Sequence, residues 1–162
     1  MTIEIQGYLT QQKLEEALKK LVGIDNWIGS EFMVPNKKMR WDMAFKQGEK
    51  IAVVEFDGDS HYRDPTVIKR DRLKDEFAWG LGYNVIRIPY WVQLTSETAK
   101  FYFNFDCEIK QDSHHGFIVS KWLPASFCDL GISRFHSELE LLPPAVKKSV
   151  ILSLEEKIKR LG

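Results

Sequence analysis

Residues 40–61 constrain the fold more than any other part of the chain, because they have the pattern of two strands joined by a short polar turn. Apolar side chains alternate with polar or small ones in the first strand, which is the period-two signal of a half-buried strand: Trp41, Met43 and Phe45. The connector 46–49 is polar and contains Gly48, so we expect the second strand to return antiparallel. The alternation places Asp42 on the opposite face from the three apolar residues.

The second strand, residues 51–57, is apolar until it reaches two carboxylates, Glu55 and Asp57. Side chains two positions apart share one face of a strand, and Asp42 is expected to lie across the hairpin from them. Three carboxylates at one spot repel one another unless protonation or a bound cation neutralises them. Oxygen ligands of this kind suit Mg²⁺ or Mn²⁺.

Metal-assisted phosphodiester hydrolysis is the chemistry that such a site favours. A metal ion held by Asp42 and Glu55 would polarise a scissile phosphate and lower the pKa of a bound water. His61 follows Asp57 by four residues and titrates near neutral pH, so it is a candidate general acid or base. The catalytic prediction is therefore Asp42, Glu55, Asp57 and His61.

Two sequence motifs carry a resemblance to a known family. The order of Asp42 and then EFDGDSH at 55–61 resembles the PD-(D/E)XK nuclease superfamily. Within it, the chain is similar to the E-x-D-G-x-x-H variant of small restriction-endonuclease-like domains related to very-short-patch repair endonucleases. The segment GYNVIR at 82–87 is similar to the G-Y-x-V-x-R strand of that group. The resemblance covers about the first ninety residues.

This resemblance implies a metal site and leaves one role open. Asp42 and Glu55 would be the metal ligands, joined by the main-chain carbonyl of Phe56. The family carries a lysine where this chain has Asp57. Either His61 or a lysine on the following helix could take the place of that lysine in orienting the attacking water.

The remaining sequence predicts an α/β (α+β) fold with a restriction-endonuclease-like αβββαβ core, in which helices flank a central mixed sheet. The expected elements of this core are a helix at 11–22 capped by Thr10, strands at 27–34, 40–45 and 51–57, a helix at 63–79 and a strand at 83–89. A turn is expected at 35–38. Residues 1–90 would form the nuclease-like core, and residues 91–162 a mainly helical extension packed on the same domain. The elements expected in that extension are a strand at 117–123 and helices at 124–128, 131–142 and 144–161.

Three basic residues are candidates for contact with nucleic acid. Lys69 and Arg70 lie on the helix 63–79, where they could bind phosphate or pair with neighbouring acids on a solvated face. Arg87 sits among aliphatic residues of the last core strand, so it needs either a phosphate or a local acid as its partner.

Composition limits the protein's surroundings and its mode of binding. The 162 residues have a formal net charge of zero and a pI of about 6.9, so phosphate contacts would come from a local basic patch. Cys107 and Cys128 lack a disulfide-framework spacing, and no signal sequence is visible, which predicts a cytoplasmic protein. No apolar run approaches the roughly twenty residues of a membrane span.

The leading hypothesis is a Mg²⁺- or Mn²⁺-dependent endonuclease that hydrolyses DNA, as part of a restriction or repair system. The alternative is a catalytically silent subunit with a nuclease fold that binds nucleic acid or a partner protein. A third possibility is a nuclease that acts beside a partner specificity subunit, because the sequence contains no recognisable DNA-reading motif. A homodimer would be needed for a double-strand cut with one active site per chain.

Overall fold

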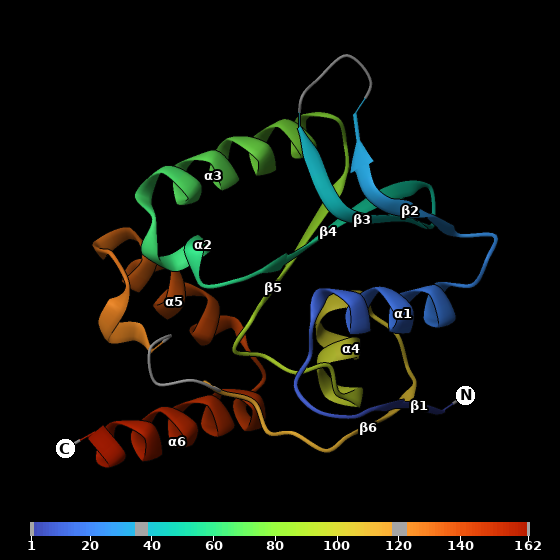
Figure 1. Cartoon of the computed structure of the whole chain (residues 1–162). Helices are drawn as coiled ribbons and strands as arrows, with labels where there is room; N and C mark the ends of the chain where they lie inside the picture. Colours follow the sequence, from blue (N-terminus) through green and yellow to red (C-terminus); the bar gives the residue numbers. More distant parts are fainter. Residues whose placement is uncertain (1, 35–38, 118–122, 162) are drawn as a thin grey trace.

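The computed structural model describes residues 2–34, 39–117 and 123–161 as an α+β fold with a mixed four-stranded sheet (Figure 1). The strands lie in the order β2 (Trp27–Met33), β3 (Arg40–Gln47), β4 (Lys50–Asp57) and β5 (Asn84–Pro89). The first three form an antiparallel meander, and β5 runs parallel to β4. Helix α1 (Gln11–Val22) lies against one face of the sheet, and helix α3 (Pro65–Gly80) lies against the other (Figure 1). The prediction of a mixed sheet flanked by helices is confirmed.

The central hairpin forms as its sequence predicts. β3 and β4 pair from Met43 opposite Val54 to Gln47 opposite Lys50. Gly48 in the turn has a φ of 64°, a left-handed conformation that glycine adopts without a side-chain clash. Because packed layers cover both faces of β4, its centre at 52–54 is fully buried.

The connection from β4 to β5 contains two helices where the sequence predicted one. A short helix, α2 (Ser60–Arg63), ends before Asp64, and α3 starts at Pro65. Asp64 is extended, with φ −104° and ψ 111°, because a residue that precedes proline disfavours the helical region. Its carboxylate then caps α3 by accepting a hydrogen bond from the Thr66 N–H at 2.9 Å. The same Asp-Pro pair therefore ends one helix and begins the next.

Trp41 does not lie on the face that the alternation predicted. Met43 and Phe45 belong to the larger hydrophobic core on the α1 side of the sheet. Trp41 instead packs with Val53 and Ala78 in a smaller cluster under α3. The β3–β4 pairing ends at Met43, so strict alternation across the sheet does not extend to the start of β3.

The C-terminal part is mainly helical but contains elements that the sequence did not indicate. Its elements are α4 (Ser96–Phe103), β6 (Glu108–Gln111), a 3₁₀ turn at Pro124–Ser126, α5 (Asp129–Leu141) and α6 (Pro144–Leu161). The predicted helices at 131–142 and 144–161 are confirmed to within two residues, whereas the one at 124–128 is only the 3₁₀ turn. The predicted turn at 35–38 and residues 118–122 of the predicted strand 117–123 lie outside the described residues.

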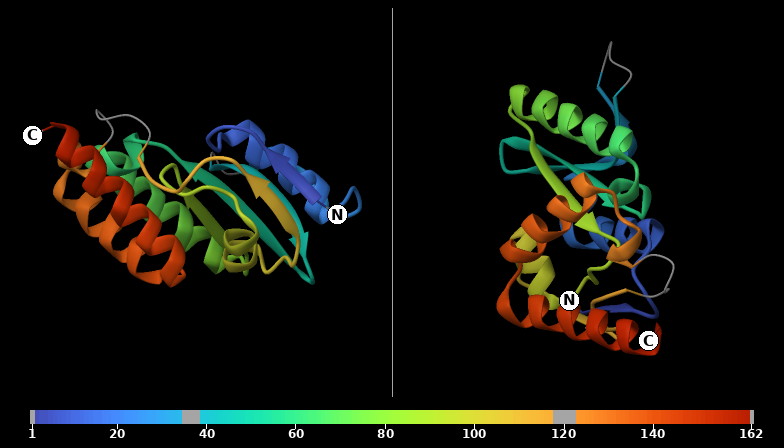
Figure 2. Two further views of the ribbon diagram at one scale, coloured as in Figure 1. Left: turned by 90° about the horizontal axis from the view of Figure 1, so that it is seen from below. Right: turned by 90° about the vertical axis from the view of Figure 1, so that its left-hand side faces the viewer.

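The larger core takes side chains from both halves of the chain. Leu14 and Val54 of the first half belong to the same cluster as Trp91, Phe135 and Val150 of the second. In addition, β1 (Thr2–Ile5) pairs parallel with β6, which joins the first residues of the chain to its C-terminal half. Helices α3 and α6 lie at opposite ends of the molecule with α5 between them (Figure 2). Within the described ranges, no helix combines the length and apolar character that a membrane span requires.

Candidate functional site

Asp42 and Glu55 meet where β3 and β4 separate. The N–H of Phe56 donates a hydrogen bond to Asp42 Oδ2 at 2.8 Å, just beyond the last β3–β4 pair. The Asp42 carboxylate thus takes the place of a backbone acceptor, which fixes it beside the start of the Glu55–Asp57 segment. Glu55 is only 5% exposed, so its carboxylate lies in a largely water-excluded position.

Lys74 of α3 completes this group. Its ammonium forms an ion pair with Glu55 Oε1 and lies 5.3 Å from the centroid of the Trp41 ring. The Lys74 side chain is 14% exposed, so the charge is held between a carboxylate and an indole with little contact to solvent. The sequence had indicated a lysine somewhere on this helix, and the packing of α3 against the sheet selects Lys74.

The pKa of Glu55 is raised to about 7. Burial is the main cause, and the negative charge of Asp42 adds to it, while the ion pair with Lys74 opposes both. The pair of acids is therefore incompletely neutralised by the protein itself. A hard cation would favour the ionised form of both carboxylates, and Asp42, Glu55 and the carbonyl oxygen of Phe56 are the ligand types that Mg²⁺ or Mn²⁺ prefers.

Asp57 lies on the same face of β4 but has a different environment. It is fully buried and contacts Arg87 Nη1 at 3.0 Å, His61 Nδ1 at 3.3 Å and Arg134 Nη2. The three predicted acids therefore do not form one uncompensated cluster, because two guanidinium groups neutralise Asp57. Sequence reasoning missed Arg134, which comes from α5, 77 residues further along the chain.

Further charged side chains extend this buried ion cluster between β4, β5, α3 and α5. Asp71 contacts His61 Nδ1 and accepts a hydrogen bond from Arg134 Nη1 at 2.8 Å. Asp75 accepts one from Arg87 Nη2 at 2.7 Å. The sequence left either a phosphate or a local acid as the partner of Arg87, and the structure shows that local acids fill this role. The Arg87 side chain is only 10% exposed. The cluster connects the end of the β3–β4 hairpin to the C-terminal helices.

The cluster shifts the pKa values of its members in opposite directions. Burial by itself would raise the pKa of Asp71, but the hydrogen bond from His61, the charge of Arg87 and the hydrogen bond from Arg134 lower it to about 2. For His61, burial lowers the pKa, but the hydrogen bond to Asp71 and the negative charges of Asp57 and Asp71 outweigh burial and raise it. The carboxylates of Asp57 and Asp71 therefore favour the protonated form of His61 more than water does.

A metal ion does not suit this second group. Asp57, His61 and Asp71 place one ligand atom each within 4.8 Å of one another. However, both carboxylates are already matched to guanidinium groups, since Arg134 contacts both and Arg87 lies 3.0 Å from Asp57. A divalent cation there would face two fixed positive charges. We therefore assign the group to the structure of the protein rather than to metal binding.

Lys69 and Arg70, the other predicted contacts with nucleic acid, lie on the exposed side of α3. Neither forms an ion pair or hydrogen bond with another residue of the described ranges. Their charges therefore remain available to a ligand, and their contact with nucleic acid stays a prediction.

Comparison with known proteins adds no relative. A scan against protein-family models and searches of curated proteins and of solved structures found no match. The arrangement of the side chains is consequently the basis for assigning a function.

Proposed function

We propose that this chain is a metal-dependent nuclease that hydrolyses DNA phosphodiester bonds, with Asp42, Glu55 and Lys74 as its catalytic groups. The observation that carries the proposal is the ion pair of Lys74 with Glu55 directly beside Asp42. Two acids and one lysine at the end of a hairpin are the side chains that the PD-(D/E)XK resemblance implies. In this chain the lysine would come from α3 instead of position 57.

The order of elements supports the same proposal. Helix α1, the meander β2–β3–β4, helix α3 and the parallel strand β5 follow one another in the αβββαβ order of a restriction-endonuclease-like core. The catalytic groups lie on the α3 side of the sheet, at the end of β4. We therefore propose this core as the fold of the domain.

Each residue has a defined task in the proposed reaction. Asp42, Glu55 and the Phe56 carbonyl would hold Mg²⁺ or Mn²⁺, which when bound activates a water molecule and polarises the scissile phosphate. Lys74 donates hydrogen bonds from its ammonium to the attacking water or to a phosphate oxygen, where it offsets the developing negative charge. Trp41 limits the positions that this ammonium can take, because the indole lies on its other side.

Asp57 and His61 act indirectly in this proposal. Their ion pairs with Arg87, Arg134 and Asp71 fix the end of β4 against α3 and α5. They thereby position Glu55, two residues before Asp57, without contacting the reacting phosphate.

Cleavage of supercoiled plasmid and of single-stranded DNA tests the proposal, with Mg²⁺, Mn²⁺ or EDTA present. We expect cleavage that requires the metal and falls at least about 100-fold in Glu55→Gln and in Lys74→Gln. Lys69→Gln removes the same charge from the exposed side of α3 and should lower the rate by only a few fold. Cleavage that persists in EDTA, or that Glu55→Gln leaves unchanged, would refute the assignment.

One observation favours a second candidate function. Glu55 is almost fully buried, and one of its oxygens is already paired with Lys74, which leaves less of the carboxylate for a metal ion. This favours a catalytically silent fold that binds nucleic acid or a partner protein. A silent subunit would bind DNA through charges such as Lys69 and Arg70 yet cleave nothing with any metal. Calorimetric measurement of Mn²⁺ binding distinguishes the two hypotheses. If the chain is a nuclease, Glu55→Gln should lose affinity for Mn²⁺, whereas a silent subunit should show no such loss.

A further inference from the structure

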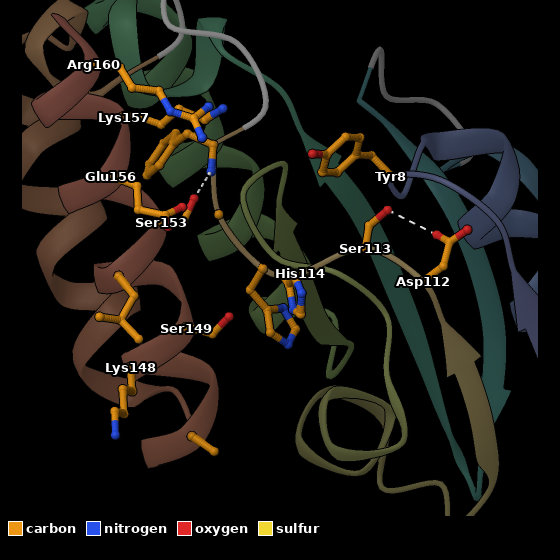
Figure 3. A pocket seen from close by; sticks show the side chains of 15 residues that line it. Tyr8, Asp112, Ser113, His114, Lys148, Ser149, Ser153, Glu156, Lys157 and Arg160 are labelled. Atoms are coloured by element: carbon orange, nitrogen blue, oxygen red, sulfur yellow. Dashed lines mark hydrogen bonds between the residues drawn. The ribbon is translucent and has the colours of Figure 1, made fainter.

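A cavity of about 550 Å³ lies at the end of the molecule away from α3, between helix α6 and residues 112–117 (Figure 3). Tyr8 stands on the wall opposite α6, and its ring faces the helix across the opening (Figure 3). A volume of this size falls within the roughly 300–1,000 Å³ range of pockets that hold small molecules. No residue of the proposed nuclease site lines it.

Three basic side chains of α6 line this cavity: Lys157 and Arg160 lie near each other at one end of it, and Lys148 lies at the other end (Figure 3). None of them forms an ion pair with another residue of the described chain, whereas the neighbouring Lys147 is paired with Glu140. Lysine and arginine are the side chains that bind phosphate most strongly, arginine through a planar fork and lysine as a point charge. The cavity therefore presents unpaired cations to any anion that enters it.

Two acids also line the cavity, and they do not neutralise these cations. Asp112 Oδ1 accepts hydrogen bonds from the Gly7 N–H at 2.7 Å and from the Ser113 hydroxyl at 3.1 Å. Glu156 is exposed and forms no ion pair with another described residue. The cavity is thus lined by three basic side chains and two carboxylates. One of these carboxylates, Asp112, binds the loop after β1 through Gly7.

The wall opposite the cations is suited to a flat ring. Tyr8 is 42% exposed, so its ring is accessible to a ligand in the cavity. Exposed aromatic rings in a basic groove are the surfaces on which nucleobases stack, independently of sequence. Ser149 and His114, which also line the cavity, add further hydrogen-bonding groups (Figure 3).

We propose that this cavity is a nucleotide-binding site, in which Tyr8 stacks on the base and Lys157 and Arg160 bind the phosphate. The ligand is either a free nucleotide or the terminal nucleotide of a nucleic-acid strand, since both present a base and a phosphate monoester. The site is separate from Asp42, Glu55 and Lys74, and it does not depend on the proposed nuclease activity.

Calorimetric measurement of the binding of adenosine 5′-monophosphate to the full chain tests the site. We expect Lys157→Gln and Arg160→Gln each to weaken binding by about tenfold or more, because each removes a charge-assisted contact. Lys159→Gln is the matched control, since it removes the same charge from a neighbouring position that does not line the cavity. Tyr8→Ala should also weaken binding about tenfold, whereas Phe101→Ala, which truncates an equally exposed ring elsewhere, should not.

Two further probes identify the source of the phosphate. Tighter binding of a 5′-phosphorylated oligonucleotide than of its 5′-hydroxyl counterpart would assign the site to strand ends, and preference for the mononucleotide would assign it to free nucleotides. Equal affinity for adenosine and its monophosphate would overturn the proposal, as would an equal loss in Lys157→Gln and Lys159→Gln. Absence of binding by every probe would overturn it as well. Glu55→Gln should bind the nucleotide normally, so a failure of the nuclease proposal and a failure of this one are distinguishable.

Discussion

Replacement of Asp57 by asparagine tests whether this acid is structural or catalytic. The side chain keeps its size but loses its charge, while both of its guanidinium partners remain in place. Asp57 is fully buried, and its two oxygens contact Arg87 and Arg134. The substitution therefore leaves positive charges that are buried and short of a counter-charge.

The expected cost follows from this geometry. Removal of one partner from a buried ion pair destabilises a protein by about 3–5 kcal/mol. For a chain of this length each kcal/mol corresponds to about 2–4 °C in the midpoint of thermal unfolding, so we expect a fall of about 6–20 °C. Asp71 and Asp75 still face the two arginines, which places the result toward the lower half of that range.

Urea unfolding followed by circular dichroism measures the free energy of unfolding, with Asp106→Asn as the control. Asp106 pairs with Lys100 on the surface, and its side chain is 86% exposed, so its loss should cost at most about 1 kcal/mol. The double variant Asp57→Asn/Arg134→Gln should cost less than the sum of the two single changes. A loss for Asp57→Asn no greater than that of the control would refute a structural role for Asp57.

Two other predictions concern stability. Because the pKa of Asp71 falls from 3.8 to about 2 on folding, its contribution of about 2 kcal/mol is present above pH 4 and is lost as the pH falls toward 2. Asp71→Asn should accordingly flatten the dependence of the unfolding free energy on pH between 4 and 2, and an unchanged slope would contradict this. Gly131→Ala should destabilise the protein by about 1–3 kcal/mol or more, because its Cβ would lie 1.6 Å from the Tyr62 carbonyl oxygen. Gly80→Ala is the control, since outside its own helical turn no atom lies within 4 Å of the added carbon. Equal unfolding midpoints for the two variants would exclude the clash.

Local sequence determined most elements of the first ninety residues and the central pair of acids. Thr10 accepts a hydrogen bond from the Lys13 N–H at the predicted start of α1, and Gly48 lies in the predicted turn. Asp42 and Glu55 come together because a hairpin with a short turn fixes its own register. They are 13 positions apart in the sequence, so the hairpin brings them together without help from distant elements.

Only the tertiary structure decided the partners of the other charges. Lys74 and Lys69 lie on the same helix, and the way α3 packs on the sheet determines that Lys74 reaches Glu55 while Lys69 faces solvent. Nothing near Asp57 in the sequence indicates Arg134, because α5 reaches it from the other half of the chain. The pairing of β1 with β6 is equally long-range. A buried charge requires a counter-charge, and the periodicity of the sequence shows which charges will be buried. Only the packing of distant elements determines which residue supplies the counter-charge.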